Sequence, residues 1–178
     1  MSTTILTRLW RMLLLLLVQL LLLNHIHLLG YATPVVMAYL TIPFHRGASR
    51  VGLLLWGFCA GLIYDVFSNT MGLGMATGTL TAMLQPVLLN PFASADAPDD
   101  LRPTMRTMGT QPYLLYVLLT MLIYHTVFYA LDAFTLQNWQ VTLMAIGCST
   151  VMAFLFVLFV QILLSSIHSS REQQHTRK

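Results

Sequence analysis

The chain has 178 residues, of which 57% are hydrophobic and only 8% are charged, and its mean hydropathy is +0.72. This composition excludes an ordinary water-soluble domain, in which about a quarter of the residues are charged. A spanning helix needs about 20 residues, so the length allows no more than about six or seven crossings. We therefore expect one all-α integral membrane domain over residues 1–178.

The formal charge of +3 does not indicate nucleic acid, because the nine Lys and Arg residues are spread in small groups along the chain. The two cysteines, Cys59 and Cys148, lie inside apolar stretches without ligand-type neighbours at metal-binding spacing. We expect them to be small membrane-buried residues, and we expect no metal and no cofactor.

Hydropathy predicts six transmembrane helices, in chain order Leu9–Leu23, Leu28–Phe44, Val51–Phe67, Leu73–Leu89, Tyr113–Leu131 and Val141–Ile167. The first resembles a signal peptide, but no small-residue cleavage site follows it, so we expect it to be retained. The second is short and contains Pro34 and Pro43. A re-entrant element that turns back without crossing is therefore the alternative for this segment.

The basic residues fall into groups that six crossings would place on one side of the membrane: Arg8 and Arg11; Arg46 and Arg50; Arg102 and Arg106; Arg171, Arg177 and Lys178. Lys and Arg next to membrane segments favour the cytoplasmic side. We therefore expect both termini in the cytoplasm, and an irregular cytoplasmic loop over the proline-rich residues 90–112.

The third and fourth segments predict a helical hairpin with small residues at every fourth position. The pattern consists of Gly57, Gly61 and Asp65, then Ser68, Asn69 and Thr70, then Gly74, Gly78 and Ala82. Small residues at this spacing let two helix backbones approach closely, so we interpret the glycines as helix-packing positions rather than a substrate cradle. A second stripe in the last helix, Ala145, Ser149 and Ala153, would pack within the chain or against a partner.

Asp65 continues the glycine face near the outer end of its helix. An ionised carboxylate is costly there unless it is hydrated or hydrogen-bonded. Two interpretations stay open. Asp65 is hydrated at the interface while Ser68 or Thr70 caps the next helix. Alternatively, Asp65, with Ser68 and Asn69, holds the turn by hydrogen bonds or binds a polar group of a partner.

Chemistry by titratable residues has weak support in the sequence. Asp65 and Asp132 suggest a two-aspartate membrane peptidase, but Met75 stands where a Gly-x-Gly-Asp pattern needs an acid. We interpret Asp132 as a helix-end residue. The embedded His125 is interpreted as a hydrogen-bonded interior residue rather than a ligand.

Several of these residues together resemble the MreD family, the small membrane subunit of the bacterial rod-shape and cell-elongation machinery. The likeness rests on a leucine-rich first helix ending in Gln19–His27, on residues 61–69 (GLIYDVFSN) followed by Gly72, and on Gln85-Pro86 before the loop. Residues 103–109 (PTMRTMG) are close to the form in Bacteroidetes members. Gln85 departs from the pattern, which has a basic residue before the proline.

The resemblance, which covers the chain end to end, implies a non-enzymatic subunit of the bacterial inner membrane without a cofactor. Its partner would be MreC and, through MreC, the MreB filament, RodA and a penicillin-binding transpeptidase that extend peptidoglycan. It also implies a fold similar to the substrate-binding subunits of energy-coupling-factor vitamin transporters.

The mechanism that we expect docks the transmembrane helix of MreC on the small-residue stripes and the polar cluster around Asp65. The loop with Arg102 and Arg106 would meet cytoplasmic or lipid partners. The competing hypothesis is a transporter subunit in which the same six-helix domain encloses a small vitamin-like ligand, and a membrane peptidase is a third.

Overall fold

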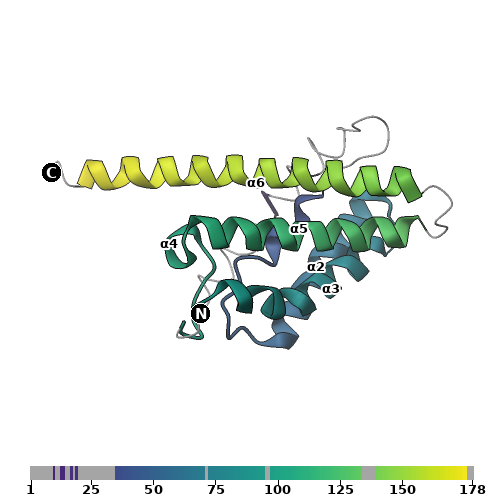
Figure 1. Cartoon of the computed structure of the whole chain (residues 1–178), viewed down its shortest axis with the longest axis horizontal. Coiled ribbons are helices and arrows are strands. Elements are labelled where there is room, and N and C mark those ends of the chain that lie inside the picture. Colours follow the sequence, from purple (N-terminus) through teal and green to yellow (C-terminus); the bar gives the residue numbers. More distant parts are fainter. Residues whose placement is uncertain are drawn as a thin grey trace.

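The computed structural model describes residues 35–70, 72–94, 97–133 and 139–175, together with Trp10, Leu13, Leu14, Leu17 and Gln19. Beyond Ile162 it describes only the helical path of the chain. Every regular element in these residues is a helix (Figure 1): η2 (Val36–Leu40), α2 (Arg50–Ser68), α3 (Leu73–Leu89), η3 (Asn90–Phe92), α4 (Met105–Met108), α5 (Thr110–Asp132) and α6 (Trp139–His175).

Within the described residues, three helices are long and apolar enough to cross a membrane, namely α2, α5 and Trp139–Ile162 of α6. The 17 residues of α3 extend about 26 Å at 1.5 Å per residue, which is the lower limit for a crossing. The predicted helices at Val51–Phe67 and Leu73–Leu89 are confirmed. The helix predicted from Tyr113 already begins at Thr110, and the last helix continues past Ile167 to His175.

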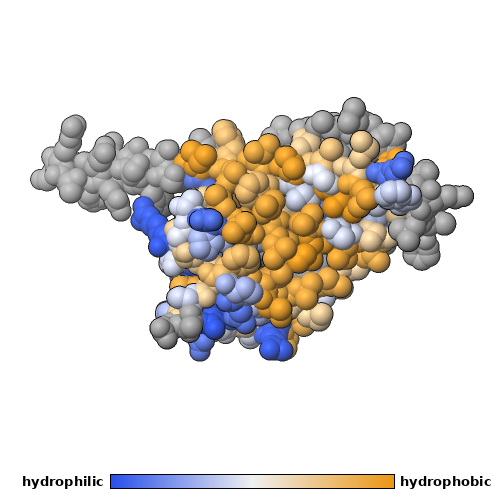
Figure 2. All heavy atoms as spheres, in the orientation of Figure 1, coloured by the Kyte–Doolittle hydropathy of each residue, from blue (hydrophilic) through white to orange (hydrophobic). Residues whose placement is uncertain are grey.

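The four long helices α2, α3, α5 and α6 pack in chain order, with α2 against α3, α3 against α5 and α5 against α6. Large apolar side chains are exposed on each of α2, α3, α5 and α6; examples are Val51, Phe67, Val87, Leu115 and Phe159. Hydrophobic residues form an orange band across the middle of the face shown in Figure 2. Hydrophilic residues gather toward the two ends of this view. Lipid-facing apolar surface and polar ends are what a membrane bundle requires.

The predicted spanning helix Leu28–Phe44 is wrong for its second half. Residues 35–44 contain only the five-residue 3-10 helix η2, followed by turns. Pro34 precedes η2 and Pro43 follows it, and proline lacks the N–H that a continuing helix needs. Residues before Val35, and most of Leu9–Leu23, lie outside the described part of the chain.

Other helices satisfy the backbone of this broken segment, which is buried along its length. The Val35 N–H donates to Nε2 of His125 at 3.2 Å, and the Val36 N–H donates to Oε1 of Gln19 at 2.8 Å. At the other end, Nε2 of Gln85 donates to the Phe44 carbonyl at 3.3 Å. Non-helical backbone at membrane depth is stable only with such partners inside the protein.

The broken segment runs antiparallel to α5. Val35 contacts His125 in the second half of α5, whereas Tyr39 lies near Tyr113 at its start, since Nε2 of Gln161 in α6 donates to both tyrosine hydroxyls at 2.7 Å. Residues 35–44 therefore lead through the bundle toward the end where α2 begins. His125 is the hydrogen-bonded interior residue that the sequence predicted.

Replacing His125 by Phe leaves the buried Val35 N–H without an acceptor. Because Nδ1 of His125 pairs with the Met121 carbonyl at 2.9 Å, Nε2 is the free acceptor that the substitution removes. We expect H125F to lower the free energy of unfolding by about 1–3 kcal/mol, measured by thermal unfolding in detergent. The control is T126V, which removes an exposed hydroxyl that bonds only within its own helix. Equal stability of the two variants would contradict this role of His125.

Candidate functional site

The hairpin of α2 and α3 is held by direct contact between two helix backbones. Gly57 faces Gly78: a Cβ atom added to Gly57 would lie 2.5 Å from the Gly78 carbonyl oxygen, and one added to Gly78 would lie 2.6 Å from that of Gly57. One turn along, a Cβ on Gly61 would overlap the backbone of Gly74. The four glycines therefore contact each other across the hairpin and are buried there.

This contact corrects the expectation that a partner helix docks on the glycine stripe. The stripe is closed by the chain's own hairpin, and an outside helix has no access to it. The second stripe is internal as well, because Ala145, Ser149 and Ala153 are buried. The Ser149 hydroxyl lies 2.9 Å from that of Tyr129 in α5.

Asp65 joins the end of α2 to the start of α3. Its side chain is only 6% exposed, and three donors surround it. Oδ1 accepts from the Gly74 N–H at 2.7 Å and the Thr70 hydroxyl at 2.5 Å, and Oδ2 accepts from the Met75 N–H at 2.9 Å. The first N–H groups of a helix lack intrahelical partners and favour negative charge. Asp65 is thus the cap of α3, and the interpretation with a hydrated Asp65 and a Ser68 or Thr70 cap is wrong.

The turn between the helices places the first N–H groups of α3 on this carboxylate. Ser68 is the last residue of α2, and Asn69 follows with a left-handed backbone at φ 56°. Gly72 precedes α3 with φ 91°. Asn and Gly are the residues that adopt positive φ most readily, so the sequence at these positions fits the reversal of the chain.

An alanine at Gly61 tests the backbone contact. Its methyl group would overlap the Gly74 backbone, so α2 and α3 must separate and lose packing along the hairpin. We expect G61A to lower the free energy of unfolding by about 1–3 kcal/mol, measured by thermal unfolding. The matched control is G147A in α6, where an added Cβ meets no atom within 4 Å. A G61A protein as stable as G147A would show that the contact is looser than described.

An asparagine at Asp65 tests the cap. It removes the charge beside the start of α3 and sets an amide N–H against one of the backbone donors. We expect D65N to lose about 1–3 kcal/mol of unfolding free energy, again from thermal unfolding. The control is D132N, because Asp132 is exposed at the end of α5, at the same end of the bundle. Similar losses for both substitutions would contradict a specific cap.

Arg102 and Arg106 are exposed at the opposite end of the bundle. The loop that carries them folds back on the segment before α2, where the Arg46 N–H donates to the Leu101 carbonyl at 3.0 Å and the Gly47 N–H to the Asp99 carbonyl at 2.7 Å. Residues 90–112 are less irregular than predicted. They contain η3, α4 and the start of α5.

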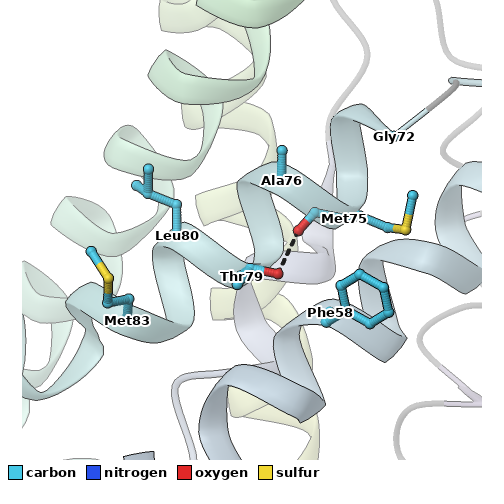
Figure 3. A pocket seen from close by; sticks show the side chains of 7 residues that line it. All are labelled: Phe58, Gly72, Met75, Ala76, Thr79, Leu80 and Met83. Carbon is cyan, nitrogen blue, oxygen red and sulfur yellow. Dashed lines mark hydrogen bonds between the residues drawn. The ribbon is translucent and has the colours of Figure 1, made fainter. Parts of the chain in front are cut away.

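An open groove lies on the face of α3 that points away from the bundle, and the sequence analysis did not predict it. Its volume is about 470 Å³, and it is lined by Phe58 of α2 and by Gly72, Met75, Ala76, Thr79, Leu80 and Met83 (Figure 3). The Thr79 hydroxyl donates to the Met75 carbonyl at 2.7 Å, so it adds no unpaired donor to this apolar surface. The signal in the sequence is a second set of small residues, Gly72, Ala76 and Thr79, at helical spacing beside the Gly74 and Gly78 stripe.

The described residues therefore offer a closed hairpin, an open apolar groove beside it and an arginine-rich end. They contain no group of three or more His, Cys, Asp or Glu side chains that could hold a metal ion. No protein-family model, curated protein or solved structure matches the chain.

Proposed function

We propose that this chain is a non-enzymatic membrane subunit of the bacterial cell-elongation machinery, of the MreD type. In this role it binds the transmembrane helix of MreC and, through MreC, supports peptidoglycan synthesis with MreB, RodA and a penicillin-binding transpeptidase. The observation that carries the proposal is the open groove along α3, which lies on the same hairpin as the residues that resemble MreD.

The groove has the chemistry that a partner helix requires in lipid. Helices associate there through close packing, and small residues such as Gly72, Ala76 and Thr79 let a second backbone approach. Met75 and Met83 also line it, and unbranched thioether side chains adapt their shape to a partner. The docking surface that we propose is therefore this groove, in place of the closed glycine stripe.

We further propose an inner-membrane topology of six crossings with both termini in the cytoplasm. Two observations support it. The backbone pairing of residues 46 and 47 with 99 and 101 brings the two arginine-bearing segments to one end of the bundle. Residues 35–44 also lead toward that end, and a second crossing must end on the same side as Arg46 and Arg50. In this chain that part of the crossing would be a broken segment rather than a helix. Similarity to energy-coupling-factor binding subunits stays a prediction.

The alternative function, a transporter subunit for a small vitamin-like ligand, has one observation in its favour. Two buried side-chain oxygens in the described residues lack a hydrogen-bond partner, the Tyr124 hydroxyl and Oγ1 of Thr150. A polar ligand inside the bundle would satisfy such groups. Mass spectrometry of small molecules released from the purified protein would detect such a ligand.

A tryptophan at Ala76 tests the proposed docking groove. Ala76 is exposed, so the larger ring fills the groove without disturbing the hairpin. We expect A76W to reduce copurification with MreC about tenfold or more, the equivalent of a loss of about 1.4 kcal/mol in binding, while the thermal unfolding midpoint stays unchanged.

The matched control is V151W, because Val151 is exposed on the lipid-facing side of α6. V151W should copurify with MreC like the unmodified chain. If A76W also retained MreC in full, the groove would not be the docking site. If the unmodified chain failed to retain MreC, the assignment to the elongation machinery would fall.

A further inference from the structure

The end of the bundle where α2 begins gathers four arginines from two distant parts of the sequence. We define the basic platform as Arg46, Arg50, Arg102 and Arg106. Besides the two backbone bonds described above, Nη1 of Arg46 donates to the Ala97 carbonyl at 3.0 Å. The guanidinium of Arg46 is therefore used to hold the loop, whereas the side chains of Arg50, Arg102 and Arg106 are exposed.

The second half of the platform has a defined local structure. Thr104 and Thr107 form a capping box at the start of α4. The Thr107 hydroxyl also donates to the Arg102 carbonyl at 2.6 Å. These bonds hold Arg102 and Arg106 on one compact turn, which directly follows the residues that pair with Arg46 and Gly47 before α2.

The platform lies where polar ends meet the apolar surface of the bundle. Arg50 is the first residue of α2, and Val51, which follows, is 68% exposed. Leu55 on the same helix and Leu115 near the start of α5 are exposed as well. The sequence of the same loop carries three carboxylates, Asp96, Asp99 and Asp100, against the four arginines. Asp99 and Asp100 are exposed. A net positive charge thus remains directly beside exposed apolar side chains.

We propose that the basic platform binds the phosphate of an anionic phospholipid, whose acyl chains lie along the exposed apolar residues of α2. Guanidinium groups match phosphate oxygens in bidentate geometry. Juxtamembrane arginines are attracted to anionic lipid headgroups. The adjoining apolar surface of α2 favours a lipid over a soluble phosphate compound, which would gain nothing from Val51 or Leu55.

The test measures lipid binding to the detergent-solubilised full chain by native mass spectrometry, with phosphatidylglycerol and phosphatidylcholine as probes. We expect the unmodified chain to prefer phosphatidylglycerol. In the variant R50Q/R102Q/R106Q that affinity should fall about tenfold or more, since each arginine near an anionic headgroup contributes a factor of about five. Its affinity for phosphatidylcholine should not change.

Two further variants test whether phosphatidylglycerol binding follows the net charge of the platform. D99N/D100N removes two of the opposing charges and should strengthen phosphatidylglycerol binding. D132N makes a similar change at the far end of the bundle and should have no effect.

Equal binding of the two lipids, or no response to either set of platform substitutions, would overturn the proposal. Displacement of phosphatidylglycerol by millimolar inorganic phosphate would also overturn it, because the site would then recognise a soluble anion. None of these outcomes depends on MreC, so failure of this proposal is distinguishable from failure of the proposed function.

Discussion

The backbone contact between α2 and α3 is the constraint on which the rest of the structure depends. In lipid, apolar side chains gain little by leaving the acyl chains, so two helices stay together through close packing and hydrogen bonds. Gly57 and Gly61 supply the packing against Gly78 and Gly74. Asp65 supplies the hydrogen bonds to the start of α3. Together they fix the register of the hairpin, and the register decides which face of α3 looks outward.

The buried polar side chains of the bundle have a matching structural role. His125 and Gln85 hold the two ends of the broken segment 35–44, and Gln161 joins α6 to tyrosines of that segment and of α5. Because lipid offers no hydrogen bonds, such a segment exists only where protein surrounds it. Gln85 has a neutral amide that donates to the Phe44 carbonyl at one end of this segment.

The two proposed surfaces follow from this arrangement and do not overlap. The groove starts at Gly72, beside the hairpin turn, and the basic platform lies at the opposite end of the bundle. The glycine stripe is buried between α2 and α3, so no partner can reach it. Ala76 and Thr79, the small residues on the neighbouring face of α3, line the surface that stays open. In the two proposals, a partner helix and a lipid headgroup would therefore occupy separate parts of the chain.

The sequence by itself determined the membrane class, the helices at Val51–Phe67 and Leu73–Leu89, and the small-residue stripes. Hydropathy and residue spacing are local properties, and they survive folding unchanged. The sequence could not determine which small residues contact another helix and which stay accessible. Gly72 and Gly74 are the same residue type two positions apart, yet Gly72 lines an open groove and Gly74 is buried against Gly61. Only the tertiary structure decided that Asp65 caps α3, that residues 35–44 are not a helix, and that Arg46 and Arg102 share one end. Pro34 and Pro43 make a continuous helix unfavourable over residues 35–44. The hydrogen bonds that decide each of these features form only in the folded chain: Asp65 with the start of α3, His125 with Val35, and Arg46 with Leu101.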